Sequence, residues 1–354
     1  MRLISYIVRR LLFAIPTLLG LSLIIFYTTM FFPPRQRVRL FISESQYQNP
    51  RGPDPVPALI EKYHLNDPFL IQYTTWLREV LRGNFGYSHS YNKPAVNIIL
   101  RFFPATLELI IFAAPITIFG GYTLGVLSAK RAHRKGLHGD VVDYVTRTIT
   151  TIGYSLPSFV LGLLLLVIFY LVLGWIQPGR LSIELQTFVS SPTSGWVSYT
   201  GLLTIDGLLN GRPDITLDAL RHLVLPVIIL VTQNLAILTR ITRSSMVGEL
   251  VKPYMVTAKA KGLDEENVIR HAKKNSLISV LTVSGVLFAT MLTGVVVTEY
   301  VFLISGIGSL VVHAASNLDF VLLVDVSLLF CVVFMLFSLI VDIAYAYIDP
   351  RIKP

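Results

Sequence analysis

The residues best suited to chemistry or docking concentrate in one polar stretch, residues 249–276, between two long apolar segments. Its charged side chains include Asp264, Glu265, Glu266, His271, Lys273 and Lys274. Such a stretch could dock a protein partner, or it could be a solvated loop that orients the chain at a membrane. For His271, a solvated position is favoured over a role as a proton carrier.

The residue patterns of nucleotide hydrolysis and metal chemistry are missing from the sequence. No glycine is followed by lysine, so the chain has no Walker A loop for ATP phosphates. The 7 histidines are scattered, and none belongs to an H-E-x-x-H or Cys/His cluster. No Ser/His/Asp set can be singled out either. We therefore expect no catalytic residue, metal site or cofactor in this chain.

The polar stretch is predicted to form two short helices joined by a glycine. Pro253 suits the first turn of a helix, where its missing N–H costs little. Gly262 would end that helix in a left-handed conformation. Asp264 would begin the second helix, with its carboxylate at the positive end of the helix dipole. Tyr254 and Ala258, at i,i+4 spacing, would present a small apolar face with a basic rim.

The rest of the chain has the composition of an integral membrane protein. It is 53% hydrophobic and only 14% charged, with a mean hydropathy of +0.64. Uncharged runs of about 18 or more residues indicate membrane-spanning helices. Six spans are predicted: Leu11–Phe32, Pro104–Ala129, Leu156–Ile176, one from near His222 to Arg240, Leu277–Val301 and Phe320–Tyr347. The fold class is an all-α polytopic membrane protein.

Clusters of basic residues predict the orientation of these spans. Lys130, Arg131, Arg240 and Arg243 directly follow apolar runs, so residues 130–140 and 246–276 should face the cytoplasm, as should both termini. The net charge of +9 fits this bias and does not indicate nucleic-acid binding.

The organisation follows from this orientation. Residues 1–32 form the cytoplasmic N-terminus and first span, and residues 33–103 an external segment with short helices at Val56–Tyr63 and Gln72–Leu81. Residues 104–354 form a five-helix core. Within the core, residues 177–221 are predicted to be an irregular external loop, and Ser305–Asn317 a short external turn shaped by Gly306 and Gly308.

Two acidic residues lie within the apolar segments, Glu299 late in the fifth span and Asp325 in the sixth. A charge at the centre of a bilayer costs roughly 2.5–3.5 kcal/mol on insertion scales, so each should face a cavity or a partner. Both are candidates for lining a translocation path. The alternatives are a contact with another subunit and a place at the outer interface.

Ordered motifs resemble a known family. Thr257 to Leu263 (TAKAKGL), followed by Arg270-His271-Ala272, resembles the cytoplasmic coupling loop of permease subunits of binding-protein-dependent ABC importers, in the dipeptide/oligopeptide branch. Motifs at 6–17, 62–68, 72–73, 83–86, 155–159, 240–243, 306–308 and 345–351 match that branch in order. The departures are Phe32-Pro33-Pro34-Arg35 in place of a Pro-Gly-Asp-Pro motif, Ser305 in place of a proline, and a longer 177–221 segment.

The resemblance implies a type I importer permease in the plasma membrane of a prokaryote. It implies four kinds of contact besides membrane lipid: a second homologous permease, two cytosolic ATPase subunits that bind ATP and Mg, an external solute-binding protein, and a solute. The ATPase-coupling residues would be Tyr254, Thr257, Ala258, Ala260, Gly262, Leu263, Arg270 and His271. The solute would be a peptide, with an oligosaccharide, glutathione or a metal chelate as alternatives.

Two other classes of function need features that this sequence lacks. A proton- or sodium-coupled carrier would need several convergent intramembrane ionisable groups and often has inverted repeats. A membrane-embedded enzyme would need a nucleophile or metal set inside the spans. Only Asp325 and Glu299 are available, so both classes are less favoured.

Overall fold

The structure is a computed structural model that describes residues 2–42, 54–135 and 155–348, together with Tyr144, Thr148, Thr151 and Gly153. Of the predicted cytoplasmic loop at 130–140, residues 136–140 lie outside the described residues.

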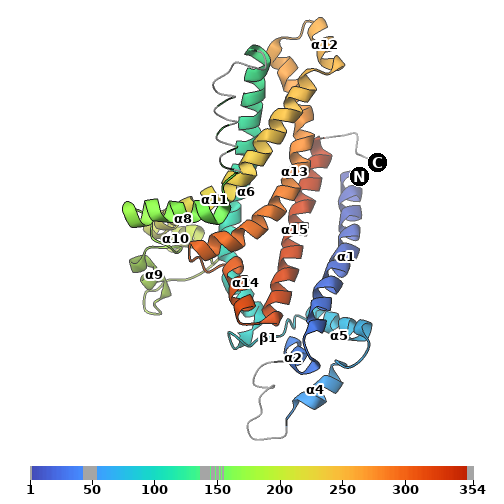
Figure 1. Cartoon of the computed structure of the whole chain (residues 1–354), viewed down its shortest axis with the longest axis vertical. Coiled ribbons are helices and arrows are strands. Elements are labelled where there is room, and N and C mark those ends of the chain that lie inside the picture. Colours follow the sequence, from blue (N-terminus) through green and yellow to red (C-terminus); the bar gives the residue numbers. More distant parts are fainter. Residues whose placement is uncertain are drawn as a thin grey trace.

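Five helices among the described residues are long and apolar enough to cross a membrane. They are α1 (Arg2–Thr28), α6 (Ala95–Lys135), α11 (Pro213–Leu250), α13 (Glu265–Val301) and α15 (Phe320–Ile348). Figure 1 shows them running along the long axis of the molecule, with α12 beyond one end and β1 near the other. Helices α6, α11, α13 and α15 each contain a predicted span and extend beyond it, whereas α1 ends at Thr28, four residues before the predicted end of the first span.

Close packing of α6 against α11 forms the centre of the bundle. A Cβ added at Gly125 of α6 would lie 2.5 Å from the Thr242 Cβ and 2.8 Å from the Thr239 carbonyl oxygen of α11. Only glycine permits this approach of the two backbones. On the other side of the bundle, α1 packs against α15, and Arg10 forms a 3.1 Å ion pair with Asp342. The first turns of α1 and the last turns of α15 therefore lie on the same side of the molecule (Figure 1).

The third predicted span, Leu156–Ile176, forms a shorter helix than expected. It consists of α8 (Ser158–Leu166) and a continuing π-helical segment, η3 (Val167–Val172). This apolar helix is shorter than the roughly 20 residues that a perpendicular crossing requires. In Figure 1, α8 lies across the direction of the long helices.

The prediction of an irregular loop over residues 177–221 is wrong. This segment holds α9 (Ile183–Ser190), α10 (Leu203–Leu209) and the first turns of α11 from Pro213. It also has a small apolar core of its own, in which Leu181, Leu203, Ile215 and Ala219 are buried. The fourth predicted span accordingly begins nine residues too late.

The predicted turn at Ser305–Asn317 is also wrong, because Ile307–Ser316 forms helix α14. Gly306 has a φ of −118°, so it does not need the left-handed conformation of a tight turn. Its small size matters instead. A Cβ there would lie 2.2 Å from the Glu299 Oε1 atom.

The segment between α1 and α6 packs onto the end of α1. It contains η1 (Thr29–Phe31), α2 (Pro34–Arg37), η2 (Val38–Leu40), α4 (Val56–Lys62), α5 (Phe69–Leu81) and the hairpin of β1 (Tyr87–Ser88) with β2 (Lys93–Pro94), where Tyr87 is opposite Pro94. The two predicted helices of this segment are confirmed to within three residues. Trp76 of α5 is 1% exposed and stacks on Phe26 of α1 with ring centroids 4.9 Å apart.

Candidate functional site

The polar stretch folds at the end of the long helices. Helix α11 ends at Leu250, α12 spans Pro253–Ala260, and α13 begins at Glu265. The first predicted short helix is confirmed, but the second is wrong as a separate element. It is the first part of α13, which continues without a break to Val301. No proline or left-handed residue interrupts this sequence, so the helical hydrogen bonds run on into the membrane segment.

The turn between the two helices is a Schellman motif centred on Gly262. The Leu263 N–H donates to the Ala258 carbonyl at 3.3 Å, and the Gly262 N–H donates to the Lys259 carbonyl at 2.9 Å. Gly262 has a φ of +80°, the left-handed conformation that glycine adopts at least cost. Asp264 then caps α13 by accepting from the Asn267 N–H at 3.3 Å. The backbone therefore reverses direction within a few residues.

One methionine attaches α12 to the bundle. Met255 is 1% exposed and belongs to a buried cluster with Val126, Ala129, Met246, Leu250, Val268, Ile269 and Ala272. These side chains come from α6, α11 and α13. Sequence reasoning missed Met255, because its partners become neighbours only when α12 folds back on α13.

A hydrogen-bonded chain fixes the other side of α12. The Tyr254 hydroxyl donates to Glu249 Oε2 at 2.6 Å and accepts from Asn275 Nδ2 at 2.9 Å. Lys252 Nζ lies 2.6 Å from Glu249 Oε1. Partial burial and the hydrogen bond to the Glu249 carboxylate raise the pKa of Tyr254, so the phenol stays protonated and keeps donating. Glu249 and Asn275 were not singled out as site residues, since their joint contact with Tyr254 depends on the turn at Gly262.

The predicted coupling residues are placed together, but the apolar face differs from the expected one. Ala258 is half-buried against the Met255 cluster, and the Tyr254 ring is tied back by its hydroxyl. The outward apolar side chain of α12 is Val256, which is 65% exposed, with Ala260 one turn further on. The remaining predicted residues are also exposed: Thr257, Gly262, Leu263, Arg270 and His271.

The two predicted intramembrane acids are both buried inside this chain. Glu299 is fully buried, and its carboxylate accepts from the Thr106 hydroxyl at 2.5 Å and from the Ser309 N–H at 3.0 Å. It thus holds α13 to α6 and to the first turn of α14. Asp325 of α15 is 2% exposed, and neither of its oxygens has a hydrogen-bond partner among the described residues. Neither carboxylate faces an open surface in this conformation.

These features define a polytopic helical membrane protein with a projecting helical element at one end. The chain belongs to the family of binding-protein-dependent transport system inner membrane components, whose pattern matches residues 121–354. It is therefore the multi-pass membrane component of an ABC import system.

Similarity to characterised proteins extends over nearly the whole chain. It is 35% identical over 352 residues to the dipeptide transport system permease protein of Alkalihalophilus pseudofirmus, with 99% of both chains covered. It is 32% identical over 351 residues to an oligopeptide transport system permease protein of Bacillus subtilis and 33% identical over 353 residues to one of Escherichia coli, again with 99% of both chains covered.

Proposed function

We propose that this chain forms half of the translocation path of an ATP-driven peptide importer and that α12 docks a cytosolic ATPase subunit. The observation that carries the proposal is the rigid attachment of α12. Met255 is buried against three helices, while Val256, Ala260 and a rim of basic residues stay exposed. This combination suits a helix that enters a groove of a partner and transmits its movement.

Helix α13 provides a route for that movement. It runs as one helix from the turn at Gly262 to Glu299, whose carboxylate contacts α6 and α14. A displacement of α12 by the ATPase would therefore tilt α13 and shift its contacts at the other end. We propose that ATP binding and hydrolysis shift the population between two such packed arrangements, open to opposite sides.

We further propose six spans with both termini in the cytoplasm. The ion pair between Arg10 and Asp342 supports a common side for the two termini. The basic residues at 130–131 and 240–243 support a cytoplasmic position for the α12 end. In this arrangement α8 and η3 would form the third of the six crossings.

The proposed complex contains a second, homologous permease, two ATPase subunits that bind ATP and Mg, and an external solute-binding protein. Peptides are the proposed solute, because the relatives described above bear the names of dipeptide and oligopeptide permeases. Oligosaccharides, glutathione and metal chelates are less favoured, since no contact described here points to them.

Reconstitution tests this function. The chain is incorporated into proteoliposomes with its partner permease and ATPases, and binding protein loaded with labelled peptide is added outside. Uptake should require ATP inside and binding protein outside. Uptake driven by a proton or sodium gradient without ATP would contradict the proposal and favour a secondary transporter.

A further inference from the structure

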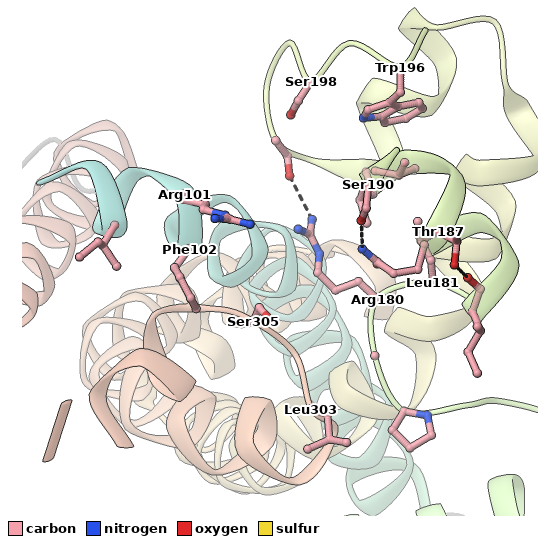
Figure 2. Close-up of a pocket in the computed structure, with 18 of the residues that line it drawn as sticks. Arg101, Phe102, Arg180, Leu181, Thr187, Ser190, Trp196, Ser198, Leu303 and Ser305 are labelled. Atoms are coloured by element: carbon pink, nitrogen blue, oxygen red, sulfur yellow. Dashed lines mark hydrogen bonds between the residues drawn. The ribbon is translucent and has the colours of Figure 1, made fainter. Parts of the chain in front are cut away.

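A large cavity lies toward the end of the molecule opposite α12. Its volume is about 1330 Å³. Figure 2 shows it between the first turns of α6, the segment around α9, and the turn that follows α13. Neither α12 nor the turn at Gly262 contributes a residue to this cavity, so the proposed docking of the ATPase does not explain it.

The lining of this cavity carries charge of one sign. It includes Lys93, Arg101 and Arg180 and no aspartate or glutamate. Arg180 is partly neutralised, because its Nη2 donates to Glu108 Oε2 at 2.7 Å and to the Gly201 carbonyl at 3.0 Å. Lys93 and Arg101 are exposed and form no ion pair with any residue that the structure describes. A concave surface with unpaired cations concentrates anionic ligands.

Two buried carboxylates near this lining, those of Glu108 and Asp319, are already engaged by protein groups. Besides Arg180, Glu108 accepts from the backbone N–H and the hydroxyl of Thr204, at 2.8 and 2.7 Å. Asp319 is fully buried and accepts from the hydroxyls of Ser88 and Ser90, both at 2.6 Å. Neither carboxylate is therefore available to neutralise Lys93 and Arg101.

Buried hydrogen bonds hold one wall of the cavity in place, which favours a binding site over a gap between loops. Asp206 is fully buried, and its carboxylate accepts from the N–H groups of Thr200 and Gly201 at 2.8 and 2.9 Å. These bonds hold the backbone at Gly201, whose carbonyl accepts a hydrogen bond from Arg180. A site formed in advance loses little conformational entropy when a ligand binds.

The other lining groups suit a peptide. Asn97, Gln186 and Ser305 offer amide and hydroxyl groups that can hydrogen-bond peptide groups, and Tyr91, Phe102 and Trp196 offer aromatic surface. The volume also exceeds the roughly 300–1,000 Å³ of most small-molecule pockets. An inorganic anion would fill little of it, whereas several residues of an extended peptide would fit.

We infer that this basic external cavity, defined by Lys93, Arg101 and Arg180, receives the carboxylate-bearing end of a peptide before it enters the membrane path. The inference rests on the proposed peptide import and adds a site and a recognised group to it. The free carboxylate pairs with Lys93 and Arg101, while the remainder of the peptide contacts the polar and aromatic lining.

The test uses the reconstituted complex and two peptides that differ only at their C-terminus, one a free acid and one an amide. Binding protein is saturated with each peptide separately, and initial uptake is measured for the parent and for the double variant Lys93→Gln/Arg101→Gln. Arg78→Gln is the matched control, since Arg78 is an exposed arginine of α5 without a described ion pair and outside the cavity lining. The affinity of the loaded binding protein for the complex is measured in parallel.

The double variant should lower uptake of the free acid about tenfold and change uptake of the amide by less than about twofold, as expected for a lost charged hydrogen bond. Arg78→Gln should change neither. Equal loss for both peptides, or no loss, would overturn the inference. A parallel loss of binding-protein affinity would also overturn it, because the cations would then contact an acidic surface of that protein. Failure of the parent to import either peptide would instead contradict the proposed function.

Discussion

Replacing Gly262 by valine tests whether the turn before α13 sets the position of α12. Gly262 has a φ of +80°, and a Cβ built there meets no atom within 4 Å. The cost of Gly262→Val is therefore conformational and not steric. An L-residue in the left-handed region loses about 1–2 kcal/mol, and a β-branched side chain lies at the upper end or beyond. This cost lowers the population of the correctly placed α12 by roughly 5–30-fold.

Gly248→Val is the matched control for this change. Gly248 lies in α11 near the same element, it is exposed, and a Cβ there also meets nothing within 4 Å. Its helical conformation accepts valine, which has a helix propensity slightly better than that of glycine. The two variants thus make the same chemical change with and without backbone strain.

Co-purification measures the outcome. The permease pair is isolated with each variant, and the ATPase retained per permease is quantified together with substrate-stimulated ATP hydrolysis. Gly262→Val should insert normally and keep its partner permease, but lose most of the ATPase and the stimulation, whereas Gly248→Val should keep both. Full ATPase retention and normal stimulation in Gly262→Val would refute the reasoning.

Three further changes test other contacts. Met255→Ala should cost about 2–5 kcal/mol, because a fully buried side chain is truncated; hydrogen exchange should increase in α12, and unchanged exchange would contradict its anchoring role. Glu108→Gln should destabilise the packing of the 177–221 segment by about 1–3 kcal/mol, because Arg180 loses its charged partner and Thr204 loses a charged acceptor. Limited proteolysis should then cut first in this segment. Resistance equal to that of the parent would contradict a stabilising role of Glu108. Asp325→Val should raise the melting temperature of the purified protein, because it removes a buried carboxyl group that has no hydrogen-bond partner among the described residues. A lower melting temperature would mean that the Asp325 carboxyl group does have a hydrogen-bond partner.

Local signals in the sequence were sufficient for the long helices and for the turn at Gly262. Uncharged runs predicted the five long apolar helices that the described residues form. Pro253 stands at the first position of α12, Gly262 just past its end, and Asp264 at the cap of α13, as their backbone preferences require. Each of these predictions depends on residues that are close in sequence.

Features that depend on distant contacts could not be predicted in the same way. The small core around Leu181 and Ile215 stabilises α9 and α10, and no periodic pattern of apolar residues in the sequence predicts this core. Glu299 was expected at a path or a partner, but it bonds Thr106, 193 residues away, and the start of α14. Gly306 was explained by turn geometry, whereas the structure requires a small residue beside that carboxylate.

The central claim is that α12 faces the ATPase while the α9 region faces the opposite side of the membrane. Cys331 is the single cysteine, so Cys331→Ser gives a background for one introduced thiol. Val256→Cys in α12 and Ile183→Cys in α9 replace side chains that are 65% and 71% exposed. A photo-activated thiol cross-linker is attached to each in the assembled complex. Val256→Cys should give a cross-linked product with the ATPase and Ile183→Cys none. An ATPase product from Ile183→Cys, or its absence from Val256→Cys, would contradict the account.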